Sequence, residues 1–254
     1  MVEEQVMKVR LTFLQDVLGT QPTDSKIYES FLATKMRKEM EKSGYKEEKI
    51  DEKINKGMEA LPNNEDGEFY RDGVTVFPRL KIKETGEEIP AIEGYLLKGF
   101  FKNACWACAK ADGLSAELSA YKKYIDNMTD VNEISPIIVN DDVKKYMEEH
   151  KGTLPLFQRP IRISDRNGER VALACSEYVP AGSYIDFEIT AMSEEALNFV
   201  IEWLNYGKHN GLCCWRNSGK GKFDWIDLDL GAKREINPKA IKKKGKKKKA
   251  DDEE

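Results

Sequence analysis

The sequence predicts an α+β domain of ferredoxin-like or RRM-like type, with one antiparallel sheet, a helical insertion and a disordered basic C-terminal tail. Residues 7–14 alternate apolar and polar side chains, as a half-buried strand does. Residues 93–111 and 193–206 carry apolar side chains at helical spacing. Short alternating segments lie before and after the second helix. Strand, helix, strands, helix, strand is the element order of that fold.

Composition argues against a disordered, a membrane-spanning and a secreted protein. The chain has 254 residues, 40% of them apolar, which suffices for a core and argues against disorder. No apolar run approaches the roughly 20 residues of a membrane helix, and Met1–Glu4 is acidic where a secretory signal is basic. The five cysteines are an odd set, which favours reduced thiols. We therefore expect a cytoplasmic protein without a membrane partner.

The net charge of −4 conceals an asymmetry between the body and the tail. Residues 233–254 carry ten basic and five acidic side chains, whereas residues 1–232 carry 31 basic and 40 acidic ones. We expect residues 1–232 to be the folded domain and residues 233–254 to be a disordered lysine-rich tail with an acidic end. Any polyanion must therefore bind to the tail or to a local basic surface on an acidic body.

The remaining elements follow from local patterns. Asp24 can cap the first helix of an insertion at about 24–61, and Ser193 can cap the helix that follows it. Asn167-Gly168 predicts a tight hairpin turn. Alternation predicts a strand pair before Pro90, at 74–77 and 80–83, and further strands at 134–139, 159–163, 170–174, 184–189 and 223–228. Residues 117–127 predict a short helix, and residues 141–150 a polar helix or mobile excursion.

A loop rich in glycine and cations spans residues 211–223, between the last helix and the last strand. Closely spaced glycines can let backbone amides approach a phosphate, and Arg216, Lys220 and Lys222 supply positive charge. The alternative is a tight turn with solvated lysines. The spacing does not match the Walker motif.

Three segments in this order resemble the RAMP superfamily, the RRM-like backbone subunits of CRISPR effector complexes. They are the helix-opening segment 90–102, the turn Val179-Pro180-Ala181-Gly182 and the glycine-rich loop. The resemblance implies that Lys98, Lys102 and residues 219–222 lie against a sugar-phosphate backbone. The Trp215–Gly221 segment is also similar to proteins of Firmicute prophages. The acidic body and the insertion depart from the family, and no aspartate aligns with the residue that cleaves RNA in type III complexes.

A second set of cations flanks the predicted hairpin, at Arg159, Arg162, Arg166 and Arg170. Alternate positions on a strand project to one face, so Arg159 and Arg162, three residues apart, need not share a face, while two sides of the turn can. Trp215, Tyr178 or Tyr184 can stack on bases, with burial in the core as the alternative.

Two groups of residues have the composition of metal sites but also have simpler explanations. Asp126, Asp130, Asp141 and Asp142 can in principle hold a metal, but aspartates in polar loops are usually solvated. Cys105-x-x-Cys108 with Cys213-Cys214 suggests zinc, but cysteines in an apolar helical stripe usually pack as small hydrophobic residues. We expect no metal, no cofactor and no catalytic residue.

The sequence thus predicts a noncatalytic protein of phage or prophage type that binds single-stranded DNA or RNA and forms homo-oligomers or filaments along the strand, with phage recombination or replication proteins or CRISPR proteins as possible partners. One alternative is an RNA-binding and RNA-cleaving subunit of a type III CRISPR effector. Another is a phage inhibitor that mimics such a subunit. The predicted contacts are Lys98, Lys102, Arg159, Arg162, Arg166, Arg170, Trp215, Arg216, Gly219, Lys220, Gly221 and Lys222.

Overall fold

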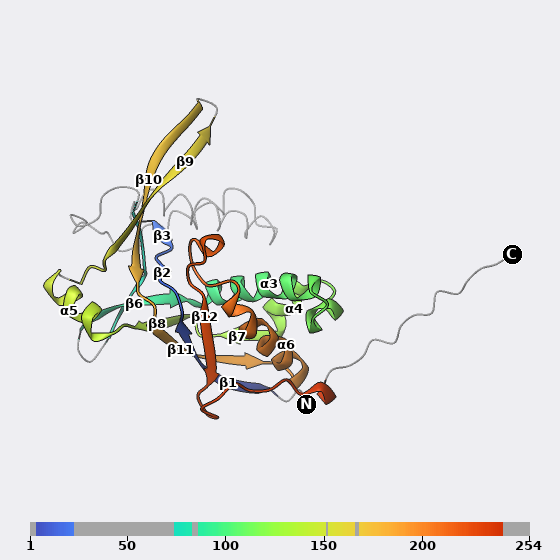
Figure 1. Cartoon of the computed structure of the whole chain (residues 1–254). Coiled ribbons are helices and arrows are strands. Elements are labelled where there is room, and N and C mark those ends of the chain that lie inside the picture. Colours follow the sequence, from blue (N-terminus) through green and yellow to red (C-terminus); the bar gives the residue numbers. More distant parts are fainter. Residues whose placement is uncertain (1–3, 23–73, 83–85, 151, 166–167, 241–254) are drawn as a thin grey trace, which may run out of the picture. The chain divides into compact units, whose positions relative to one another are not determined.

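The computed structural model describes residues 4–22, 74–82, 86–150, 152–165 and 168–240 (Figure 1). The insertion predicted at 24–61 lies outside the described residues. The chain divides into two compact units, whereas the sequence analysis treats residues 1–232 as one domain. Unit 1 comprises Met1–Val17, Arg79–Lys145 and Pro180–Glu254, and unit 2 comprises Leu18–Pro78 and Tyr146–Val179.

Unit 1 contains an antiparallel sheet with the strand order β12-β1-β11-β8-β6-β5, and β7 pairs with β11. The strands are β1 (Gln5–Phe13), β5 (Arg79–Lys81), β6 (Glu88–Glu93), β7 (Thr129–Val131), β8 (Ile134–Ile138), β11 (Tyr184–Ala191) and β12 (Phe223–Asp227). Among the described residues, the α-helices Gly94–Lys110 and Tyr121–Met128 lie between β6 and β7 in the chain, and the α-helix Glu194–Asn205 lies between β11 and β12. That order and those connections confirm the ferredoxin-like α+β fold.

The strand predicted at 7–14 is β1, which lies between the edge strand β12 and β11 in this sheet. Met7, Val9, Leu11 and Phe13 are buried, and the residues between them face the other side. The register sets Val9 opposite Phe187 of β11 and Asp227 of β12, both of them buried. Alternation therefore gives the sheet one apolar face and one polar face.

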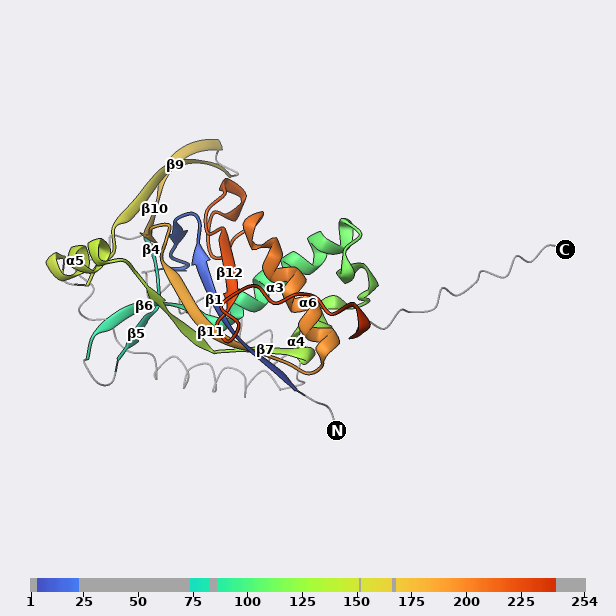
Figure 2. The ribbon, with the colours of Figure 1, turned by 60° about the horizontal axis from the view of Figure 1, so that its bottom comes forward.

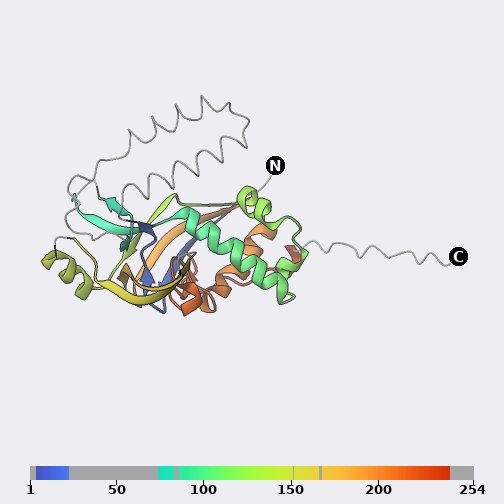
Figure 3. The same ribbon diagram turned by 90° about the horizontal axis from the view of Figure 1, so that it is seen from above.

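The apolar face is covered by α3 (Gly94–Lys110) and α6 (Glu194–Asn205), as Figures 2 and 3 show. Ring contacts join the layers: Phe101 of α3 lies 5.6 Å from Trp203 of α6, and Phe100 lies 5.0 Å from Phe223 of β12, measured between centroids. Ser193 caps α6, as predicted, because its hydroxyl accepts the Ala196 N–H at 3.1 Å. The smaller helices are η1 (Leu114–Glu117), α4 (Tyr121–Met128), α5 (Asp141–Glu149), η2 (Tyr206–Lys208), η3 (Arg216–Ser218) and η4 (Pro238–Ala240).

A buried polar network fastens η1 to α6. The Glu202 carboxylate accepts the backbone N–H groups of Leu114 at 2.5 Å and Ser115 at 3.0 Å, together with the Ser115 hydroxyl at 2.5 Å. The Trp203 indole donates to that same hydroxyl at 2.8 Å. These bonds satisfy the amides at the start of η1, and they fix the segment that follows α3.

Unit 2 contains a second sheet, of order β2-β10-β4-β3, with β9 paired to β10. Its strands are β2 (Val17–Leu18), β3 (Gln21–Pro22), β4 (Val74–Val76), β9 (Leu156–Asp165) and β10 (Gly168–Val179). The strand pair predicted before Pro90 is wrong, because β4 pairs with β3 and β10 while β5 pairs with β6, which itself contains Pro90. The predicted hairpin is longer than expected, and its turn residues 166–167 lie outside the described residues.

The first part of the predicted tail is held on unit 1. Arg234 Nε donates to the buried Asp227 carboxylate at 2.7 Å, and Asn237 exchanges two hydrogen bonds with Asn198 of α6. Lys233 pairs with Asp224. Burial raises the pKa of Asp224, but hydrogen bonds from Lys233 and Lys208 outweigh it, and the pKa lies below its ordinary value. Residues 233–240 are therefore fixed, and residues 241–254 lie outside the described part of the chain.

We predict that Glu202→Ala lowers the free energy of unfolding by about 2–4 kcal/mol, because three donors in η1 lose their acceptor. Urea unfolding followed by circular dichroism measures the change. Glu148→Ala is the matched control, since Glu148 is an exposed helical carboxylate, and we expect a change within about 0.5 kcal/mol. Equal destabilisation by the two variants would contradict the role assigned to Glu202.

Candidate nucleic-acid interface

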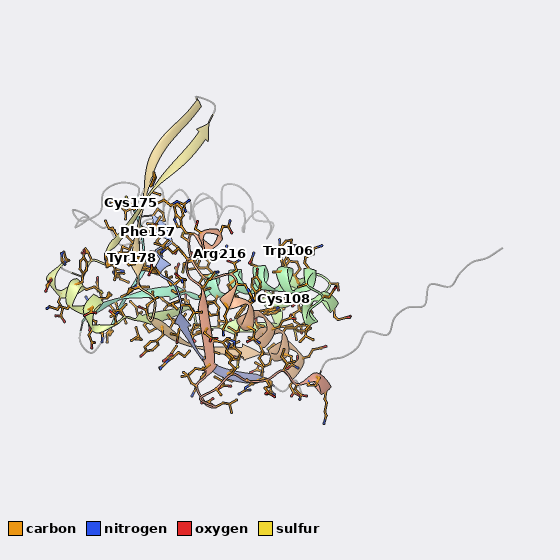
Figure 4. All side chains as sticks on the ribbon, viewed as in Figure 1. Trp106, Cys108, Phe157, Cys175, Tyr178 and Arg216 are labelled. Carbon is orange, nitrogen blue, oxygen red and sulfur yellow. The ribbon has the colours of Figure 1, made fainter. Side chains whose placement is uncertain are left out.

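The outward side of α3 carries aromatic and cationic side chains together. Positions 95, 99, 102 and 106 fall within about 60° of one another around the helix axis. Tyr95 is 52% exposed and Trp106 is 53% exposed, while a side chain at Gly99 would meet nothing within 4 Å. We call Tyr95, Gly99, Lys102 and Trp106, with the neighbouring Lys98, the α3 ridge. Figure 4 labels Trp106 on this helix.

Both lysines of the ridge are held by aspartates that follow α3 in the chain. Lys98 Nζ lies 3.3 Å from Asp130 of β7. Lys102 Nζ lies 2.7 Å and 2.9 Å from the two carboxylate oxygens of Asp126 in α4. Two of the aspartates weighed as metal ligands are therefore ion-pair partners of predicted phosphate contacts.

The glycine-rich loop is closed by a tight backbone crossing. A Cβ on Gly211 would lie 2.0 Å from the carbonyl carbon of Gly221, and a Cβ on Gly221 would lie 2.1 Å from the Leu212 oxygen. Gly221 also has φ +71°, a left-handed conformation that side chains disfavour. Gly219 has φ +82° but faces open space, apart from the Lys222 side chain at 3.9 Å.

The backbone amides of this loop have partners inside unit 1. Ser218 and Lys220 N–H donate to the Trp215 carbonyl, Gly219 N–H to that of Arg216, and Gly221 N–H to that of Asp16. These bonds occupy amides that the sequence analysis assigned to a phosphate. The N–H groups of Gly219, Lys220 and Gly221 are thus already bonded within the chain. The predicted nucleic-acid contacts at 215–222 stay a prediction.

Asp16 ties two of the three motif segments together. Its carboxylate accepts the Lys220 ammonium at 2.6 Å and the Ala181 N–H of the Pro180-Ala181-Gly182 turn at 3.4 Å. The third segment is joined by Asn210, whose side chain donates to Asn103 of α3 at 2.7 Å. The structure thus brings the motif segments together in unit 1, with Lys220 already engaged by a carboxylate.

The four cysteines considered for zinc lie in two separate environments. Burial raises the pKa of Cys108 to about 12, and the Glu202 carboxylate and Cys105 add to the rise. Burial also raises the pKa of Cys213 and Cys214, and the positive charge of Arg216 only partly opposes it. Among the described residues, no group of three or more His, Cys, Asp or Glu side chains is placed to hold a metal ion.

The arginines of the hairpin belong to unit 2. Arg159 is exposed on β9, where it is paired in register with Ala174, and Arg170 of β10 is paired with Ile163. Positions 159 and 162 fall on opposite faces of β9, because three residues separate them. Arg166 lies outside the described residues. Figure 4 labels Phe157, Cys175 and Tyr178 in the same unit.

The polar face of the unit 1 sheet has a different chemistry. Arg10 of β1 forms two hydrogen bonds of 2.7 Å with Asp186 of β11, and its guanidinium lies 4.1 Å from the centre of the Tyr184 ring. RNA-binding sheets of the RRM type stack bases on exposed aromatic rings. Here the ring of Tyr184, a predicted stacking candidate, is already covered by a cation.

The sequence analysis did not identify Tyr95 and Trp106 as candidate nucleic-acid contacts. The apolar stripe of this helix, Leu97, Phe100, Phe101 and Ala104, was recognised, and its cations were noted. The signal lay in the same periodicity, since a tryptophan about half a turn away from the stripe must face outward. An exposed tryptophan beside lysines is a candidate contact, because its ring offers a face on which a base can stack.

Comparison with solved structures finds distant structural likenesses. The chain is similar to a chain of a solved structure described as a Type IV-B CRISPR complex, with a TM-score of 0.44 and 11% sequence identity, over 92% of this chain and 94% of that chain. No protein-family model matches the sequence, and no curated protein matches it. No helix in the described part of the chain is long and apolar enough to cross a membrane.

We predict that Gly221→Ala destabilises the chain by at least about 2 kcal/mol more than Gly219→Ala. Both variants place a side chain at positive φ, at a cost of about 1–2 kcal/mol, but only the Gly221 side chain would meet the Leu212 carbonyl. Urea unfolding of both variants gives the comparison. Equal losses of stability would show that the crossing at Gly211 and Gly221 relaxes without cost.

Proposed function

We propose that this protein binds single-stranded nucleic acid without cleaving it, and that the strand lies along the α3 ridge. The observation that carries the proposal is the exposure of Tyr95 and Trp106 beside Lys98 and Lys102 on one helix. Single-strand binding needs aromatic faces on which bases stack and cations that follow the phosphates, and the sequence of bases matters little to either.

The glycine-rich loop adds cationic side chains on the other flank of α3. Asn210, just before this loop, bonds to Asn103, and the angular positions of Lys98 and Asn103 lie about 140° apart around the helix. Tyr95 and Trp106 therefore lie between Lys98 on one flank and the loop with Arg216 and Lys222 on the other. We assign phosphate contacts to both flanks and base stacking to the ridge.

The polar face of the sheet is the competing surface within unit 1. Its central cation, Arg10, is neutralised by Asp186, and its aromatic ring, Tyr184, stacks on that same cation. Desolvating this arrangement would cost an ion pair and a cation–π contact. On the α3 ridge, Tyr95 and Trp106 are half exposed, so that stacking on their rings breaks no ion pair, while the two ridge lysines are themselves paired with aspartates.

We further propose that the chain is a RAMP-like subunit that assembles with copies of itself along the strand. This part rests on the ordered motif segments, and the contacts predicted at Arg159, Arg162, Arg166 and Arg170 stay predictions. A phage or prophage origin stays a prediction based on Trp215–Gly221. The proposed site can bind either DNA or RNA, because stacking and phosphate contacts do not depend on the 2′-hydroxyl.

We predict that Trp106→Ala weakens binding of a labelled 30-mer single strand by about 5- to 150-fold, the equivalent of losing one stacked base. Fluorescence anisotropy at constant salt measures the affinity for DNA and RNA. Because Trp106 is half exposed, its removal should leave the unfolding midpoint nearly unchanged. Leu230→Ala, at another exposed apolar side chain of unit 1, is the matched control and should bind as the wild type does. Equal affinity of Trp106→Ala and wild type would rule out the ridge.

We predict that Lys98→Gln/Lys102→Gln lowers the magnitude of the slope of log K against log salt by about 1.4, since each phosphate contact to a single strand contributes about 0.7. The same anisotropy titration across a salt series gives the slope. Lys144→Gln is the matched control, because Lys144 also pairs with an aspartate on a helix. An unchanged slope in the double variant would remove both lysines from the site.

A further inference from the structure

The aspartates beside the α3 ridge point to a further property of the proposed site. Asp126 lies in the last turn of α4 and Asp130 lies in β7, and both form ion pairs with lysines of α3. The lysines are mostly covered, with side-chain exposures of 24% for Lys98 and 32% for Lys102. The aspartates are more open, at 79% for Asp130 and 48% for Asp126. The carboxylates thus form the outer layer over the cations.

We propose that Asp126 and Asp130 compete with phosphate for Lys102 and Lys98, and that this competition sets the affinity of the ridge for single strands. The inference rests on the proposed function. A carboxylate and a phosphate oxygen are both anionic acceptors for an ammonium group, so each lysine can bond fully to only one of them. A strand that engages these lysines must displace the aspartates or accept repulsion from them.

Displacement is physically accessible. Exposed ion pairs contribute only about 0–1 kcal/mol, so a phosphate can replace a carboxylate at little cost. Asp130 can turn into water without any backbone change, because its side chain is already 79% exposed. The body of residues 1–232 carries 31 basic and 40 acidic side chains, so the surrounding charge adds to the repulsion of a polyanion. The local ion pairs then lower the affinity in addition to this general repulsion.

The competition predicts a gain of affinity when the carboxylates are neutralised. The ion pair that must break before a phosphate can take the lysine lowers the affinity by about threefold, within the range of exposed ion pairs. Asp126→Asn and Asp130→Asn should therefore each raise the affinity of full-length protein for a labelled 30-mer single strand about threefold, and the double variant about tenfold. A gain is informative, because a variant that is merely less stable loses affinity.

Asp141→Asn is the matched control. Asp141 is an exposed aspartate that pairs with Lys144 on α5, so its replacement removes the same charge and the same kind of ion pair. We expect its affinity to stay within twofold of the wild type. A gain equal to that of Asp126→Asn would mean that net charge alone is responsible, and would overturn the proposal.

A double-mutant cycle isolates the competition itself. In a Lys102→Gln background, Asp126→Asn should no longer raise affinity, because the contested cation is gone. The same holds for Asp130→Asn in a Lys98→Gln background. Gains that persist without the lysines overturn the proposal.

The outcomes separate this inference from the proposed function. Wild-type binding with no gain in the asparagine variants overturns the competition and leaves single-strand binding intact. No binding by wild type or by the double asparagine variant overturns both. Binding that appears only in the double variant supports the competition directly.

Discussion

The pairing of β1 on both of its edges is the interaction on which unit 1 depends. β11 and β12 lie far from β1 in the sequence, and each pairs with one of its edges. Its alternation turns Met7, Val9, Leu11 and Phe13 toward α3 and α6, and burial of such side chains stabilises the fold by about 1.5–3 kcal/mol each. A shift of register by one residue would turn that apolar set to the polar face. The position of α3 over the sheet therefore follows from the strand pairing.

The inner side of α3 contributes to the stability of unit 1, and its outer side carries the proposed binding site. The inner side packs Phe100 and Phe101 against Phe223 and Trp203, which fixes the rotation of the helix about its axis. Once that rotation is fixed, Tyr95 and Trp106 must face outward, and Lys98 and Lys102 must face the elements that carry Asp130 and Asp126. The ridge is thus positioned by the core, while its electrostatic state is set by segments that follow the helix in the chain.

The glycines of the glycine-rich loop have a structural role in the fold. Gly211 and Gly221 allow two backbone segments to cross at a distance that excludes a Cβ, and the amides around them bond to carbonyls of unit 1. Asp16 joins the loop to the turn at Ala181 and neutralises Lys220 at the same time. Glycines in this motif therefore secure the end of β1 next to β12, and the contribution of the loop to binding falls on its side chains.

Local sequence patterns predicted β1, α3 and α6 with its Ser193 cap, as well as the antiparallel class of the sheet. Hydrophobic periodicity and capping depend on neighbouring residues, so they can be recognised in the sequence. Strand partners were not accessible in this way: nothing local separates β4 from β5, and only tertiary pairing assigns them to different sheets. The candidate cations were also evident from the sequence. Their carboxylate partners Asp16, Asp126 and Asp130 were not, since an ion pair between distant residues exists only once the fold places both side chains within reach.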